Sequence, residues 1–93
     1  MANNKSAKKH IRINKRNRLQ NQFYKSSVRT LLKMFAKDIT LYQVSQITEH
    51  KLKVQNRLNS IYKFLDKGIK KNVFHKNMVA RKKSKLAAQF KIL

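Results

Sequence analysis

The sequence from residue 5 to residue 42 is KSAKKHIRINKRNRLQNQFYKSSVRTLLKMFAKDITLY, and it predicts one long helix with two unlike halves. The half that ends at Arg18 is basic and has no apolar stripe. The second half carries large apolar side chains at spacings of three and four, which place them on one helical face. These side chains are Leu19, Phe23, Val28, Leu31, Leu32, Phe35, Ile39 and Tyr42. We therefore expect later parts of the chain to fold back against the second half, while the first half projects as a basic arm.

The charge of the chain restricts the class of partner. The 93 residues, enough for one small domain, include 24 Lys and Arg against 3 Asp and Glu, a net charge of +21. No acidic residue precedes Asp38 or follows Asp66. Such charge repels itself and destabilises a compact state unless a partner or counterions neutralise it. Nucleic acid is the commonest partner of this kind, and an anionic membrane surface is the alternative.

Several classes of function lack the residues that they need. The chain has no cysteine, so it forms no disulfide and no thiolate metal site. Its three histidines are scattered, its three carboxylates are far apart, and one glycine cannot build a nucleotide-cradling loop. No apolar run is long enough to cross a bilayer, and the basic N-terminus has no signal-peptide core, although a transit peptide stays an alternative. We expect no enzyme, metal, cofactor or small-molecule substrate.

The remaining pattern predicts an all-α fold. The chain has no proline and its only glycine is Gly68, whereas a strand-rich domain of this size needs turn residues. We expect the first helix to end between Asp38 and Gln43, with a connection over roughly residues 41–47. Ser45 or Thr48 would then cap the second helix, as Asn3 or Asn4 would cap the first. The apolar face of the second helix is Ile47, Val54, Leu58, Ile61 and Leu65, flanked by Leu52, Tyr62 and Phe64.

The end of the second helix has two readings. Gly68 could be the terminal left-handed residue, or the helix could continue to Ile69 and leave that position to Asn72. We prefer Asn72, because Gly68 falls on the packed face, where a missing side chain allows close helix approach. The third helix is expected from about His75 to Phe90, and its packed face is Val79, Leu86 and Phe90, with Ala80 and Ala87.

The expected helix lengths predict an overhang. At about 1.5 Å per residue the three helices measure about 55, 36 and 24 Å, so the later two cover only part of the first. The predicted fold is an antiparallel three-helix bundle whose long N-terminal helix protrudes as a basic arm. Residues 1–93 form a single domain, in which residues 1–18 are the arm, extended or helical on its partner, and residues 19–93 are the bundle.

Two basic clusters are candidates for phosphate contacts, because Lys supplies point charges and Arg a planar fork. The predicted site residues are Lys5, Lys8, Lys9, Arg12, Lys15, Arg16, Arg18, Lys25 and Arg29 in the first helix, and His75, Lys76, Asn77, Arg81, Lys82, Lys83 and Lys85 at the third. Among the aromatic residues, Tyr24 alone lies off the predicted stripes and is the candidate for contact with a base.

Four stretches together carry a family resemblance. They are MANNKSAKK (residues 1–9), KSSVRT (25–30), LDKGIKKNVFHKN (65–77) and VARKKSKL (79–86). In this combination the chain resembles ribosomal protein S20 of the small subunit of bacteria and plastids. The resemblance weakens between about residues 37 and 52, where this sequence is several residues longer and lacks the usual acidic or glycine turn. Asn72 stands where the family commonly has glycine.

The resemblance implies a structural protein of the small ribosomal subunit that binds 16S-type ribosomal RNA directly. It implies contacts with the 5′ domain and the penultimate 3′ helix during assembly, beside neighbouring small-subunit components, in a plastid stroma or a bacterial cytoplasm. We expect no membrane partner and no homo-oligomer. A histone-like DNA-compacting protein and a membrane-active amphipathic protein are the rival hypotheses.

Overall fold

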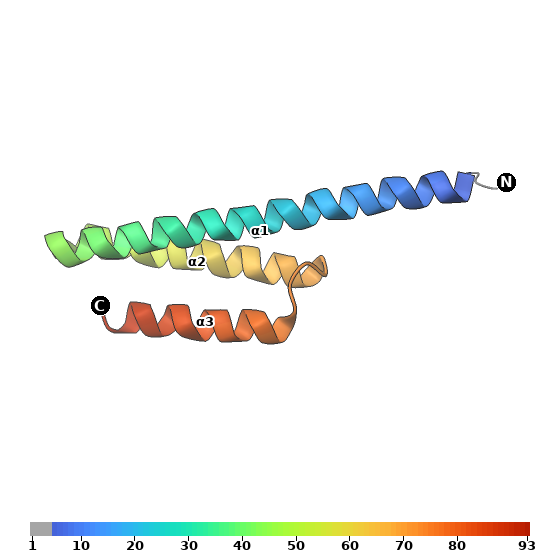
Figure 1. Cartoon of the computed structure of the whole chain (residues 1–93). Helices are drawn as coiled ribbons and strands as arrows, with labels where there is room; N and C mark the ends of the chain where they lie inside the picture. The colour runs from blue at the N-terminus through green and yellow to red at the C-terminus, as the bar shows by residue number, and fades with distance from the viewer. Residues whose placement is uncertain (1–4) are drawn as a thin grey trace.

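The computed structural model describes residues 5–93, which form three α-helices and no strand (Figure 1). They are α1 (Lys5–Ser45), α2 (Thr48–Lys70) and α3 (Lys76–Lys91). The predicted all-α fold with a long first helix is confirmed. The expected caps Asn3 and Asn4 lie outside the described residues.

The three helices run up, down and up, and α2 lies between the other two (Figure 1). Helix α3 packs on α2, and within the described part of the chain no Cα atom of α3 comes within 8 Å of one in α1. The molecule measures 67 × 22 × 13 Å along its principal axes, so it is long and rather flat. The bundle is therefore not closed by a direct backbone approach of α3 to α1. The N-terminal part of α1 extends beyond both other helices (Figure 1).

All three helices contribute to one apolar core. Phe35 of α1 is 1% exposed and packs with Val54 and Ile61 of α2 and with Val79 of α3. The buried cluster as a whole consists of Val28, Phe35, Val54, Leu58, Ile61, Leu65, Val79 and Leu86. Burying a side chain of this size stabilises a fold by about 1.5–3 kcal/mol. The core thus ties the second half of α1 to α2 and α2 to α3, and leaves the first half of α1 uncovered.

The predicted stripe of α1 is wrong at its upstream end. Leu19 and Phe23 are 54% and 57% exposed, whereas Tyr24 is 9% exposed. The five-residue step from Phe23 to Val28 turns the helix by about 500°, which rotates Phe23 well away from the packed side. Tyr24 stands one turn before Val28 and packs edge-on against Phe23 and Phe64, with ring centroids 5.4 and 6.2 Å away. Tyr24 is therefore a core residue, which corrects its assignment as a candidate for base contact.

The first connection is shorter than predicted. Helix α1 continues to Ser45, so only Gln46 and Ile47 separate it from α2. Gln46 takes a left-handed φ of 56°, and its N–H donates to the carbonyl of Tyr42 at 2.8 Å. Ile47 occupies the N-cap position without a side-chain cap, so the predicted cap by Ser45 or Thr48 is wrong. The Ser45 hydroxyl is instead hydrogen-bonded to Nδ1 of His50.

The second connection agrees with the preferred prediction. Helix α2 passes through Gly68 and ends at Lys70, and Asn72 has a left-handed φ of 61°. The N–H of Val73 donates to the Gly68 carbonyl at 2.8 Å, and that of Asn72 to the Ile69 carbonyl at 3.0 Å. These two bonds satisfy carbonyl groups that the end of the helix would otherwise leave unpaired.

Gly68 lies in a tight contact, as expected, but with a different partner. A Cβ atom placed there would come within 2.1 Å of Cδ2 of Phe74. The element that approaches closely is therefore the ring of Phe74, from the connection, and not a neighbouring helix. The ring covers the last turn of α2 just before the chain enters α3.

Helix α3 is capped by the side chain of His75. The ring Nδ1 of His75 accepts a hydrogen bond from the N–H of Asn77 at 3.1 Å. Val79 and Leu86 are buried, but Ala80 and Ala87, predicted for the packed face, are exposed. The reason is that the backbone of α3 approaches α2 but not α1, so only one narrow stripe of α3 is covered.

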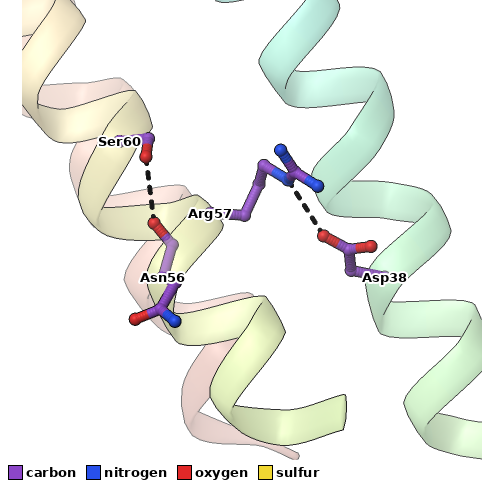
Figure 2. Close-up of polar contacts among 4 residues, drawn as sticks. All are labelled: Asp38, Asn56, Arg57 and Ser60. Carbon is purple, nitrogen blue, oxygen red and sulfur yellow. Dashed lines mark hydrogen bonds and ion pairs between the residues drawn. The ribbon is translucent and has the colours of Figure 1, made fainter.

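Two ion pairs connect α2 to its neighbours. Figure 2 shows Arg57 of α2, whose Nε donates to Oδ2 of Asp38 in α1 at 3.0 Å. Lys83 of α3 contacts Oδ1 of Asp66 at 2.6 Å. Each pair thus joins α2 to one of the flanking helices.

Replacing Gly68 by alanine should destabilise the fold, although alanine normally favours a helix. The Phe74 ring must shift to admit the new methyl group, at a cost of about 1–3 kcal/mol in the free energy of unfolding. In a Phe74→Ala background the same change should instead stabilise by about 0.5–1 kcal/mol. Urea unfolding followed by circular dichroism measures both, and stabilisation by Gly68→Ala alone would contradict the contact.

Asn72 should tolerate glycine but not alanine. Asn72→Gly keeps the left-handed turn without strain, whereas Asn72→Ala should lower the free energy of unfolding by roughly 1–2 kcal/mol. Asn59→Ala, at an exposed position within α2, is the matched control and should cost nothing. Equal effects of alanine at positions 59 and 72 in urea titrations would refute the role of the turn.

Candidate nucleic-acid interface

The basic arm is a helix with cations on several sides. All seven of its predicted contact residues are exposed, and residues 5–18 contain no acidic residue. These exposed side chains are Lys5, Lys8, Lys9, Arg12, Lys15, Arg16 and Arg18. Because the helix runs on into the packed half without a break, the positions of these charges are fixed relative to the bundle.

Where the arm joins the bundle, a lysine from the end of α2 lies beside α1. Lys71, at the end of α2, lines a shallow hollow together with Arg16, Asn17 and Gln20 of α1. No local sequence pattern predicts that these residues lie together, because their proximity depends on how far α2 extends along α1. The hollow brings two cations together where the arm leaves the bundle.

Further along α1, a second basic region faces α3. Lys25 and Arg29 of α1 and Lys82 of α3 line one hollow of about 300 Å³, whose wall includes Leu32 and Met78. Leu32, Met78 and Lys82 also line a neighbouring hollow of about 610 Å³. The full lining of this larger hollow is Leu32, Phe35, Ala36, Ile39, Met78, Arg81, Lys82, Lys85, Leu86 and Gln89. Since the two hollows share residues, we treat them as one feature, the α1–α3 groove.

The α1–α3 groove corrects the predicted arrangement of charges. The sequence predicts two basic clusters, one in the first helix and one at the third. In the structure, Lys25 and Arg29 border the same groove as Arg81, Lys82 and Lys85. Part of the first cluster therefore joins the second, and the arm is the separate region.

Three predicted residues of the third helix have structural partners. Lys83 is half-buried, pairs with Asp66, and its Nζ lies 5.2 Å from the centre of the Tyr62 ring. The backbone carbonyl of Lys83 also accepts a hydrogen bond from the Tyr62 hydroxyl at 3.3 Å. His75 and the Asn77 N–H are used in the helix cap, whereas the side chain of Lys76 is exposed.

Several exposed cations are not among the predicted site residues. Lys33 and Lys37 follow Lys25 and Arg29 at steps of four, so they extend the same side of α1. The four-residue spacing alone is enough to predict that these lysines share one side of the helix with Lys25 and Arg29. A further group lies on the exposed side of α2, away from the core, and its members are Lys63, Lys67 and Lys70.

The chemistry available here is neutralisation of negative charge. Across residues 5–93 no group of three or more potential ligands is arranged to hold a metal ion. Within the same range no helix has both the length and the apolar character to cross a membrane. Exposed Lys and Arg side chains on rigid helices can contact phosphate oxygens by charge-assisted hydrogen bonds.

Comparison with known proteins identifies the family. The sequence model described as Ribosomal protein S20 matches residues 2–91. Small ribosomal subunit protein bS20c of Phaeodactylum tricornutum is 62% identical over 92 residues, which cover 99% of both chains, and that of Trieres chinensis gives the same values. The bS20 protein of Crocosphaera subtropica is 47% identical over 87 residues, covering 94% of this chain and 90% of its own. The chain therefore belongs to the ribosomal protein S20 family and is a structural ribosomal protein rather than an enzyme.

Proposed function

We propose that this protein binds 16S-type ribosomal RNA directly, through the 5′ domain and the penultimate 3′ helix, and stabilises the folding of that RNA during assembly. As an S20-family protein it is a constituent of the small ribosomal subunit, in a plastid stroma or a bacterial cytoplasm. The observation that carries the proposal is the arm, a helical stretch with seven exposed cations and no acid. Neighbouring small-subunit components complete its surroundings.

Recognition of this kind reads the shape of the RNA more than its sequence. The deep, narrow major groove of an RNA helix hides the base edges, so the backbone is what a helical protein can contact. Arg12, Arg16 and Arg18 offer planar guanidinium groups that can hold a phosphate with two bonds, and the lysines add point charges. The long continuous helix α1 presents them at fixed distances.

The protein has two separate basic regions with which to join two RNA segments. The 13 residues from Arg12 to Lys25 correspond to about 20 Å along the helix axis. One region is the arm, residues 1–18, and the other is the rim of the α1–α3 groove within the bundle of residues 19–93. A molecule that binds one segment at each region acts as a clamp that holds them at a set spacing.

Removing charge from the arm should weaken RNA binding more than removing the same charge elsewhere. The variant Lys8→Gln, Arg12→Gln, Lys15→Gln should lower the salt slope of binding to the 5′ domain by about 3, since each lost phosphate contact removes about 1. The matched control, Lys63→Gln, Lys67→Gln, Lys70→Gln on the outer side of α2, has the same net charge and should leave the slope near the wild-type value.

The assay is filter binding at several salt concentrations that bracket about 150 mM, with unrelated structured RNA and duplex DNA as competitors. Equal losses in the two triple variants would contradict the role of the arm. Removal of all binding by either competitor would leave a generic polycation and would refute the proposed function.

Neighbouring lysines of α3 should behave differently. Lys82 is exposed on the groove rim, so Lys82→Gln should lower the salt slope by about 1 and leave stability unchanged. Lys83 pairs with Asp66, so Lys83→Gln should leave the slope unchanged and lower the free energy of unfolding by up to about 1 kcal/mol. Urea unfolding beside the binding assay separates the two effects, and a reversed pattern would contradict the assignment.

A further inference from the structure

The α1–α3 groove combines an apolar floor with a basic rim. The floor contains Leu32, Phe35 and Ile39 of α1 with Met78 and Leu86 of α3. The rim cations are Lys25 and Arg29 on one side and Arg81, Lys82 and Lys85 on the other. No carboxylate is among the residues that line either hollow. The ligand that fits both parts must therefore be apolar on one side and negatively charged on the others.

RNA phosphates satisfy the rim but not the floor. A phosphate moved against aliphatic side chains loses hydration without gaining a partner, which costs free energy. Phosphates would therefore contact the rim cations from outside and leave the floor open. Filling the floor is favourable for an apolar surface, because it removes the exposed part of Met78 and its neighbours from water.

The shape of the groove suits an α-helix. Residues of α1 and α3 line the groove, and these two helices run in the same direction on either side of α2 (Figure 1). The groove is therefore bordered by two parallel helices, as is the open position of an incomplete four-helix bundle. From Lys25 to Ile39 the groove follows about 14 residues of α1, or about 21 Å, which is about four helical turns. A helix that presents apolar residues at spacings of three and four fills such a groove.

We propose that the α1–α3 groove docks an acidic amphipathic helix of a partner protein. The apolar stripe of that helix packs on Leu32, Ile39 and Met78. Its Glu and Asp side chains, on both flanks of the stripe, pair with Lys25 and Arg29 on one edge and with Arg81, Lys82 and Lys85 on the other. Docking relieves the repulsion between these five cations and covers the open side of the bundle.

If the proposed function also holds, the partner helix and RNA compete for the rim cations. The helix then shields the groove of the unassembled protein and leaves when RNA binds. This consequence rests on the proposed function, whereas the docking itself does not. The test below therefore contains no RNA in its first stage.

The first probe is a synthetic helix of about 18 residues with leucines at spacings of three and four and glutamates on both flanks. A scrambled peptide of the same composition is its control. In fluorescence anisotropy with the full chain at about 150 mM salt, the helix should bind at least about tenfold more tightly than the scrambled peptide. Equal binding would mean attraction by net charge alone and would overturn the proposal.

The second stage locates the site at unchanged charge. Ala36 lines the groove floor, and leucine is nearly as good a helix former, so Ala36→Leu fills the floor with little effect on α1. We expect it to weaken binding of the probe about tenfold. Ala87→Leu, at an exposed position of α3 outside the groove, should leave binding unchanged. Equal affinities of the two variants would overturn the proposal.

A rim pair supports the same conclusion if the floor variant folds poorly. Lys82→Gln, Lys85→Gln should weaken binding of the probe more than Lys63→Gln, Lys67→Gln, which removes the same charge from the outer side of α2. Equal losses would refute docking in the groove. If the probe does not bind and Ala36→Leu lowers affinity for the 5′ domain instead, RNA occupies the groove floor and the proposal fails while the proposed function stands.

Discussion

The packing of the second half of α1 along α2 is the contact on which the other features of the molecule depend. Phe35 and Val28 share one buried cluster with Val54, Leu58 and Ile61, and this interface fixes the direction of the whole of α1. The backbone of α3 makes no comparable approach to α1 and lies against α2, while its side chains Val79 and Leu86 share the common core. The α1–α3 groove exists because α2 supports both of its walls, and the arm keeps its orientation because its helix is already anchored downstream.

The few acidic residues serve the fold and do not moderate the charge of the arm. Asp38 pairs with Arg57 and Asp66 with Lys83, so two of the three carboxylates join α2 to a neighbouring helix. The more exposed of the two, Lys83 with Asp66, contributes at most about 1 kcal/mol, which is small beside the apolar core. Their position matters more than their strength. Both aspartates lie where two helices meet, so the arm and the groove rim contain only cationic side chains among their charged residues.

Local signals were enough to predict much of the fold. The helical pattern without proline and the left-handed residue at Asn72 depend on local signals, and both agree with the structure. The predictions that failed depend on which side of a helix meets a partner. Phe23 and Tyr24 exchanged roles because one five-residue step shifts the stripe, and Lys83 has an acidic partner 17 positions away. The groove needs the relative placement of three helices, which no single stretch encodes.

Helix α1 is continuous from the arm into the bundle. It therefore fixes both how far the arm extends and the direction in which each arm side chain points about the helix axis. One residue inserted after Arg18 would turn every upstream side chain by about 100° about the axis of α1 and advance it by about 1.5 Å, without disturbing a buried contact. Seven inserted residues would nearly restore the direction and add about 10.5 Å of reach. Such insertions leave the packing of the core unchanged. They would alter the binding of a rigid ligand that contacts both the arm and the bundle. For such a ligand the spacing between the arm and the bundle is therefore set in whole turns of helix.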